Sequence, residues 1–172
     1  GKGRMPSTRM GNLAVNRQTW IAAQEYKRKM DAGEKVTHDL ALETLSGVLS
    51  GDILIHNHCY RAAEMAIVID MGKEFGYKVS AFHHAVEAYK IGDMLAREGI
   101  CSAIWADWYG FKMEAYDAIP ENAAILHKRG ACIVIHSDDE NQIQRLNQEA
   151  AKAQADARRA AVFRPALTWP MA

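Results

Sequence analysis

The stretch Ile53-Leu54-Ile55-His56-Asn57-His58-Cys59-Tyr60-Arg61 places a short apolar run directly before a cluster of polar and aromatic residues. The same arrangement returns in residues 77–84, 101–109 and 132–140. The helical segments between these runs end at a glycine, as loops from a helix to a strand commonly do. Strand starts lie roughly 22 to 31 residues apart, the period of a strand–helix unit. The pattern therefore predicts four consecutive βα units.

The helices expected after the four strands cover residues 61–75, 86–97, 114–129 and 141–161. Two more are expected before the first strand. One starts at a cap formed by Ser7 or Thr8 and closes at Gly33, and a shorter one follows over residues 39–49. We thus expect a helical segment in residues 1–50 and a parallel βα region in residues 51–172, together making effectively one domain.

The predicted strands are apolar with little alternation, which is typical of parallel strands covered on both faces. Right-handed crossovers then give an α/β fold with a parallel sheet. Four such units fit either an open doubly wound sheet or half of a (β/α)8 TIM-like barrel, and periodicity alone does not choose between them. A complete barrel needs about 250 residues, more than the 172 present here.

The charge and hydropathy of the chain limit the classes of partner that it is expected to bind. Lys and Arg total 21 and Asp and Glu total 21, so there is no basic excess for binding nucleic acid. No apolar run approaches the roughly 20 residues that span a bilayer, so no membrane partner is expected. No apolar region of a signal peptide follows the first residues. We favour a cytoplasmic location, or a periplasmic one if a signal has been removed.

The three cysteines, Cys59, Cys101 and Cys132, are an odd number at long spacings and form no CxxC pair. A thiolate zinc finger is therefore not expected. We expect all three to be free and buried in or beside strands, because free cysteine is usually buried. On this view they place no demand on the redox environment.

Five of the seven histidines follow the predicted strands, at the strand ends where α/β folds place their sites. His56 and His58 should share one side of the first strand, since side chains alternate with a period of two. By the same rule His83 and His84 should point to opposite sides, so only one would face a given site. Together with Asp138, these imidazoles are the ligand types of a zinc site with an open position for water.

Other residues near the strand ends have two interpretations each. Tyr60 and Arg61 either bind a substrate carboxylate or make a salt bridge at the start of a helix. Trp108, between Asp107 and Tyr109, either lines a substrate pocket or packs at the rim. Acidic residues that follow the histidine motifs, such as Glu87, are expected to act on the dipole of a helix start.

The motifs resemble those of a known family. Residues 56–64, His-Asn-His-Cys-Tyr-Arg-Ala-Ala-Glu, resemble the fifth-strand segment of the amidohydrolase superfamily, in its imidazolonepropionase-like branch of metal-dependent hydrolases. Residues 83–90 resemble the sixth-strand motif of that branch, and residues 135–138 its eighth-strand segment. Residues 3–11 resemble the segment that leads into the long helix before the fifth strand. The resemblance covers roughly residues 1–155.

This resemblance implies a partial (β/α)8 barrel comprising strands five to eight, and hydrolysis of an amide or cyclic amide bond of a small molecule by metal-activated water. It implies His56, His84 and Asp138 as ligands of one or two divalent ions, zinc being expected. Asp138 would also act catalytically by taking the proton of the water. It implies that His58 lies either near the substrate or next to the metal ligands without binding the metal itself.

The family's first-strand His-x-His pair and fourth-strand lysine are absent from the 172 residues. We therefore expect association with a missing barrel half or a homo-oligomer, because a half barrel leaves two sheet edges uncovered. A rival hypothesis is a non-catalytic, self-associating α/β module with a vestigial or weak metal site. An open flavodoxin-like domain that binds a phosphorylated ligand is a third, but no glycine-rich loop follows any predicted strand.

Overall fold

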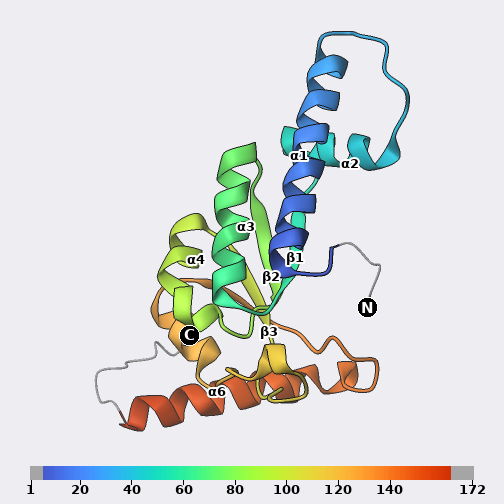
Figure 1. Cartoon of the computed structure of the whole chain (residues 1–172). Coiled ribbons are helices and arrows are strands. Elements are labelled where there is room, and N and C mark those ends of the chain that lie inside the picture. Colours follow the sequence, from blue (N-terminus) through green and yellow to red (C-terminus); the bar gives the residue numbers. More distant parts are fainter. Residues whose placement is uncertain (1–5, 164–172) are drawn as a thin grey trace. The chain divides into compact units, whose positions relative to one another are not determined.

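The structure is a computed structural model that describes the backbone of residues 6–163 and the side chains of residues 6–159, so part of the amino-terminal motif lies outside the described residues (Figure 1). The described residues form two compact units, one made of residues 6–55 and 69–78 and the other of residues 56–68 and 79–163.

The first unit contains two helices, α1 (Arg9–Asp31) and α2 (Leu40–Ser50). Thr8 caps α1, since its hydroxyl accepts a hydrogen bond from the Gly11 N–H at 3.0 Å. Asp39 caps α2 through a side-chain oxygen that accepts from two backbone N–H groups at the helix start. Both caps satisfy backbone donors that a helix start leaves without partners, which confirms the predicted helix starts.

Aromatic packing holds α1 against the chain segment that follows α3 (Ala62–Phe75). The Trp20 ring stacks on Tyr77 at 4.2 Å between ring centres. Gln24 donates a side-chain hydrogen bond to the backbone oxygen of Phe75 at 3.1 Å, and an Arg17–Glu74 ion pair lies at the surface. Burial raises the pKa of Tyr77 to about 12, so this phenol stays neutral in its packed position.

The second unit is built on a four-stranded sheet with the order β1-β2-β3-β4, and β2–β3 and β3–β4 pair in parallel. Its strands are β1 (Ile55–Cys59), β2 (Val79–His84), β3 (Cys101–Ile104) and β4 (Cys132–Ile135). Consecutive strands are neighbours, which is the order in part of a (β/α)8 barrel and confirms the predicted fold class. The fully buried side chains of this unit include Phe82, Leu95, Ile104 and Leu126.

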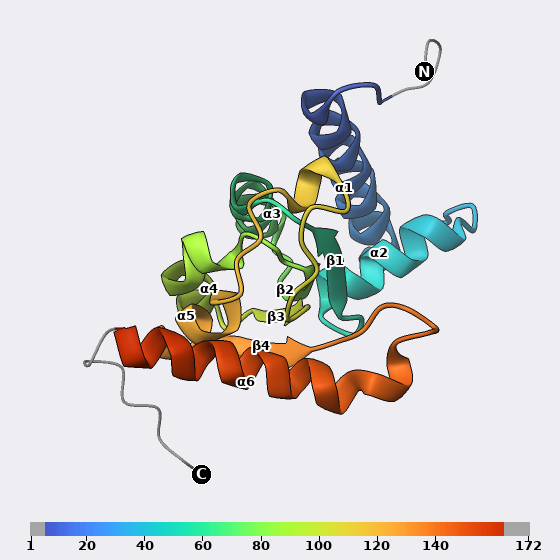
Figure 2. The same ribbon diagram turned by 90° about the horizontal axis from the view of Figure 1, so that it is seen from below.

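Helices connect the strands, but two predicted ones are shorter than expected. The segment after β2 divides into a 3-10 turn (Ala88–Ile91) and α4 (Gly92–Glu98). The segment after β3 contains a 3-10 turn (Met113–Ala115) and becomes α-helical only at α5 (Asn122–Lys128). Pro120 explains the late start, because a proline disfavours helical backbone in the residue before it. The last helix, α6 (Leu146–Phe163), lies alongside β4 (Figure 2).

The first strand begins two residues later than predicted. Ile53 and Leu54 lie outside β1 and are largely exposed, so the strand itself consists mostly of the His56-Asn57-His58 motif. Exposure alternates along β1 and β4, whereas β2 and β3 are buried on both faces. The expectation of uniformly covered strands is therefore wrong for the two edge strands, which lack a second neighbour among the described residues.

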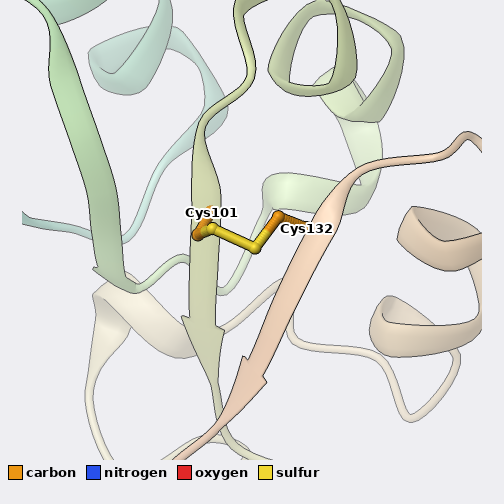
Figure 3. Close-up of a disulfide and its surroundings, with 2 residues drawn as sticks. All are labelled: Cys101 and Cys132. Atoms are coloured by element: carbon orange, nitrogen blue, oxygen red, sulfur yellow. A yellow bond between two sulfur atoms is a disulfide. The ribbon is translucent and has the colours of Figure 1, made fainter.

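A disulfide joins Cys101 at the start of β3 to Cys132 at the start of β4 (Figure 3). The two cysteines are opposite partners in the parallel ladder, with Cα atoms 4.4 Å apart. The prediction of three free cysteines is wrong for this pair, because strand pairing brings together residues 31 apart in sequence. Disulfides persist in oxidising environments, so the bond between Cys101 and Cys132 depends on the redox conditions around the protein. Only Cys59 is free and buried among the described residues.

No helix within residues 6–163 combines the length and the apolar character that crossing a bilayer requires.

Replacing both Cys101 and Cys132 by serine should lower the free energy of unfolding by about 3–4 kcal/mol, because the bond closes a loop of 31 residues in the unfolded chain. Urea unfolding followed by circular dichroism measures the change. Dithiothreitol should destabilise the wild-type chain and leave the double variant unaffected. A wild-type chain indifferent to dithiothreitol would show that the bond does not contribute.

Candidate functional site

Two histidine pairs link β1 to the carboxyl-terminal end of β2. Nδ1 of His56 lies 3.0 Å from Nε2 of His83, and Nδ1 of His58 lies 2.8 Å from Nε2 of His84. In each pair one ring donates and the other accepts, so at least one imidazole of each pair carries a neutral, unprotonated nitrogen. Neutral imidazole is also the form that binds a metal.

The adjacent residues His83 and His84 both face this cluster, contrary to the prediction that only one could. The reason is the backbone of His84, whose φ of +70° is left-handed and ends the alternation of the strand. Ala85 and Asp138 are the other non-glycine residues with positive φ in the described part of the chain. Such strained positions cluster at functional sites, and here all of them lie at the carboxyl ends of β2 and β4.

The end of β4 adds His136 and Asp138 to the cluster. The His136 ring lies 5.4 Å from that of His84 and 5.8 Å from that of His83, measured between ring centres. Oδ2 of Asp138 lies 3.4 Å from Nδ1 of His84. Nδ1 of His84 and Nε2 of His136 are buried without a hydrogen-bond partner. A native fold rarely leaves buried polar atoms unsatisfied, so these two nitrogens indicate a binding role.

Burial makes the central imidazoles weak bases. Desolvation, aided by the neighbouring His58, lowers the pKa of His84 from 6.5 to about 4, although the Asp138 carboxylate opposes the shift. Desolvation also lowers the pKa of His136. Both rings are therefore neutral at pH 7 and able to offer a lone pair.

Aromatic side chains enclose one side of the cluster. The Tyr60 ring stacks on His84 at 4.9 Å, and Trp105 stacks on both His84 and His136. Trp108 lies parallel to Trp105 at 5.1 Å between ring centres. These rings exclude water from one face of the histidines, which accounts for their desolvation.

Two residues that support the site were not singled out correctly from the sequence. The Asn122 side chain donates to the Ala85 oxygen at 3.1 Å and accepts from the Tyr89 N–H at 3.0 Å, which holds the loop after β2. Glu87 was expected to act on a nearby helix start. Its carboxylate instead accepts from the N–H of Ala62, so it caps α3 from a different loop. Only the folded chain shows these long-range partners.

The structure brings together only some of the predicted site residues. His84 and Asp138 are neighbours, and His58 is bonded to His84, whereas His56 contacts His83 instead. Three predicted substrate residues remain. Tyr60 is buried, and Trp108 packs against the hydrophobic cluster to which Tyr60 belongs. The Nε of Arg61 is buried without a hydrogen-bond partner.

The donor set matches a zinc-type metal in kind, because it offers imidazole nitrogens and a carboxylate oxygen, two of the nitrogens being buried without partners. The geometry of this donor set does not form a complete metal site. Within residues 6–163 no three His, Cys, Asp or Glu side chains converge to hold an ion. A metal at this rim would need a further ligand or a rotation of the histidines out of their mutual hydrogen bonds.

Comparison with known proteins finds two similar amidohydrolases. The chain is 30% identical over 165 residues to the amidohydrolase tasK of Hapsidospora irregularis, a match covering 86% of this chain and 17% of that protein. Its fold matches the crystal structure of an amidohydrolase from Thermotoga maritima MSB8 with a TM-score of 0.77 and 30% identity. The chain is therefore similar, in sequence and in fold, to part of two amidohydrolases.

The match spans only part of these amidohydrolases. It covers 89% of this chain but 41% of the Thermotoga protein, so the sheet corresponds to part of that relative's barrel. No family model matches the sequence. The particular branch of the family and the numbering of the strands as five to eight stay predictions.

The free energy of unfolding of the chelator-treated chain should fall as the pH drops from about 6.5 to about 4. In this window the unfolded chain protonates His84 whereas the buried ring stays neutral, so acid favours the unfolded state. The contribution is at most about 3 kcal/mol, and it should be absent from His84→Asn. Urea unfolding at several pH values measures it.

The control is His127→Asn, because this exposed histidine on α5 lies outside the cluster. This variant should keep the acid sensitivity of the wild-type chain. Equal slopes for the wild type and His84→Asn would show that His84 is not the group responsible.

Proposed function

We propose that this chain carries part of the active site of a metal-dependent hydrolase that cleaves amide or cyclic amide bonds of small molecules. The observation that carries the proposal is the pair His84 and Asp138, 3.4 Å apart and both in strained backbone, in a chain similar to part of two amidohydrolases. The imidazole of His84 and the carboxylate of Asp138 lie at the carboxyl ends of parallel strands, where barrel enzymes hold their reacting groups.

We assign His84, Asp138 and His56 as the residues that would hold one or two divalent ions, zinc being the expected one. His56 would have to leave its hydrogen bond with His83 to take part. A bound zinc ion supplies Lewis acidity, which lowers the pKa of water and polarises a carbonyl.

The chain's own residues then have distinct tasks. Asp138 accepts the proton of the attacking water at a carboxylate oxygen and returns it to the departing nitrogen, as general base and then general acid. Neutral His84 is kept in place by His58 on one ring nitrogen and faces Asp138 with the other. Tyr60 and Trp105 stack on His84 and shield it from water.

Arg61 is the group that we propose for a carboxylate on the substrate. Its Nε is buried without a hydrogen-bond partner in the described structure, and a guanidinium fits a carboxylate with two parallel hydrogen bonds. The ammonium of Lys112 lies 4.0 Å from the centre of the Tyr60 ring and 3.5 Å from a carboxylate oxygen of Glu114.

We further propose that the remaining ligands come from a barrel part that this chain does not contain, or from a second copy. The exposed alternate residues of β1 and β4, including Val134 at 47% exposure, are the surface that such a partner would cover. Size-exclusion chromatography with light scattering separates these possibilities, because only self-association gives an oligomer of this chain alone.

The purified chain should bind zinc, and both His84→Ala and Asp138→Asn should weaken binding by about tenfold or more, since each removes one ligand. Isothermal titration calorimetry with zinc alone measures the affinity. His127→Ala is the matched control, because this exposed histidine on α5 lies outside the cluster. Equal affinities for all four proteins would contradict the assigned ligands.

Hydrolysis should depend on Asp138 once the barrel is complete. In a chimera in which this chain replaces the matching segment of the Thermotoga amidohydrolase, Asp138→Asn should lower kcat by about 10²-fold or more, because the general base is lost. Dipeptides and cyclic amides are the substrates to assay. The neighbouring Asp139→Asn should retain activity, and a chimera that hydrolyses none of these substrates would refute the proposal.

A further inference from the structure

The turn after β2 contains two consecutive residues in strained backbone. The φ angles of His84 and Ala85 are +70° and +40°, in the left-handed region that favours glycine. Such residues persist only where the surrounding structure fixes their conformation. His84 is also the centre of the candidate site, because it contacts both His58 and Asp138. The groups that fix this turn therefore decide where the His84 imidazole points.

Backbone hydrogen bonds tie one side of the turn to the end of β1. The Ala85 N–H donates to the Cys59 oxygen at 3.0 Å, and the Glu87 N–H donates to the Tyr60 oxygen at 2.9 Å. A local bond from the Ala88 N–H to the Ala85 oxygen closes the turn on itself. Turns of several conformations contain such a local bond, so it does not by itself select the strained one.

The side chain of Asn122 holds the same turn from the side of α5. Asn122 is the first residue of that helix and is 5% exposed. Its Nδ2 donates to the Ala85 oxygen at 3.1 Å and to the Val86 oxygen at 3.4 Å, and its Oδ1 accepts from the Tyr89 N–H at 3.0 Å. An asparagine at a helix start commonly bonds the backbone of its own helix. These three contacts instead all go to the segment after β2, more than 30 residues earlier in the chain.

Loss of the Asn122 amide would release the strained backbone. Water does not readily replace a hydrogen bond at a buried side chain, so the turn would lose its anchor on α5. A turn relaxed to negative φ restores the alternation of β2, and His83 and His84 then point to opposite sides. The His84 ring would leave its stacked position on Trp105, where the ring centres lie 4.6 Å apart. Asn122 thus acts on the ring through the backbone.

We propose that Asn122 is a positioning residue of the active site, whose amide holds the turn after β2 and so keeps the His84 imidazole directed at Asp138. The inference rests on the proposed function, which assigns His84 and Asp138 as metal-binding groups. It adds a residue on another helix that acts on the reacting centre without being one of its ligands.

The test follows the ring contact by nuclear Overhauser spectroscopy of the chelator-treated full chain with labelled histidines. The wild-type chain should show a cross-peak between the His84 and Trp105 rings, because they stack. Asn122→Leu keeps the size of the side chain without its hydrogen bonds, and Asn122→Asp keeps the shape without the donor. Both variants should lose the cross-peak. Asn122→Leu should also weaken zinc binding by about tenfold or more, as loss of a group that orients a ligand does.

Leu126→Val is the matched control, because Leu126 lies on the same helix and is fully buried. The shorter side chain lowers stability through packing and removes no hydrogen bond from the turn. This variant should keep the cross-peak, and circular dichroism verifies that each variant folds. A cross-peak lost in Leu126→Val as well would show that the ring contact follows general stability, and the inference would be wrong.

A measurement on the wild-type chain needs no variant to fold. The side-chain amide protons of Asn122 should exchange with solvent more slowly than those of Asn147, which is exposed on α6, because they are bonded to backbone oxygens of the turn. Equal exchange rates, a wild-type chain without the cross-peak, or a cross-peak that persists in the folded Asn122 variants would overturn the inference. Zinc affinity unchanged in a folded Asn122→Leu would count against it in the same way.

The ring contact and the amide exchange are measured without metal and without turnover. If both behave as expected and the chain neither binds zinc nor supports hydrolysis, Asn122 still positions His84 and the proposed function fails. If zinc binding and hydrolysis hold while the ring contact persists in the Asn122 variants, only the role of Asn122 is wrong.

Discussion

Parallel strand pairing is the constraint on which the site and the covalent link both depend. It sets the starts of β3 and β4 opposite each other, so that Cys101 meets Cys132. It also gathers the carboxyl ends of the strands at one edge, where His84 and His136 come within 5.4 Å between ring centres. A shift of register by one residue would turn both features to the opposite face of the sheet.

The second determinant of the site is the local conformation of the backbone. The left-handed backbone at His84 releases this ring from the alternation of the strand, and Asp138 in the loop after β4 is also left-handed. Positive φ costs free energy in residues other than glycine. Hydrogen bonds and stacking compensate for that cost, because His58, Tyr60 and Trp105 all hold the His84 ring. The aromatic packing thus positions the histidine and also lowers its pKa.

Much of the fold was predictable because it follows local rules. The caps at Thr8 and Asp39, the four strands and their parallel arrangement all come from short-range patterns of apolar residues, glycine and capping side chains. The errors also have local physical causes. Pro120 delays α5, and the polar His56-Asn57-His58 motif forms the strand itself because β1 is an edge with an exposed face.

The sequence by itself determined that this is an α/β chain with histidines and Asp138 at the strand ends, and its motifs pointed to the amidohydrolase family. Only the tertiary structure decided which of these groups meet: His56 with His83, His84 with Asp138, and Cys101 with Cys132. The reason is physical. Strand periodicity is encoded within a few residues, whereas contacts between residues about 30 to 50 apart depend on register, on backbone strain and on packing against aromatic rings.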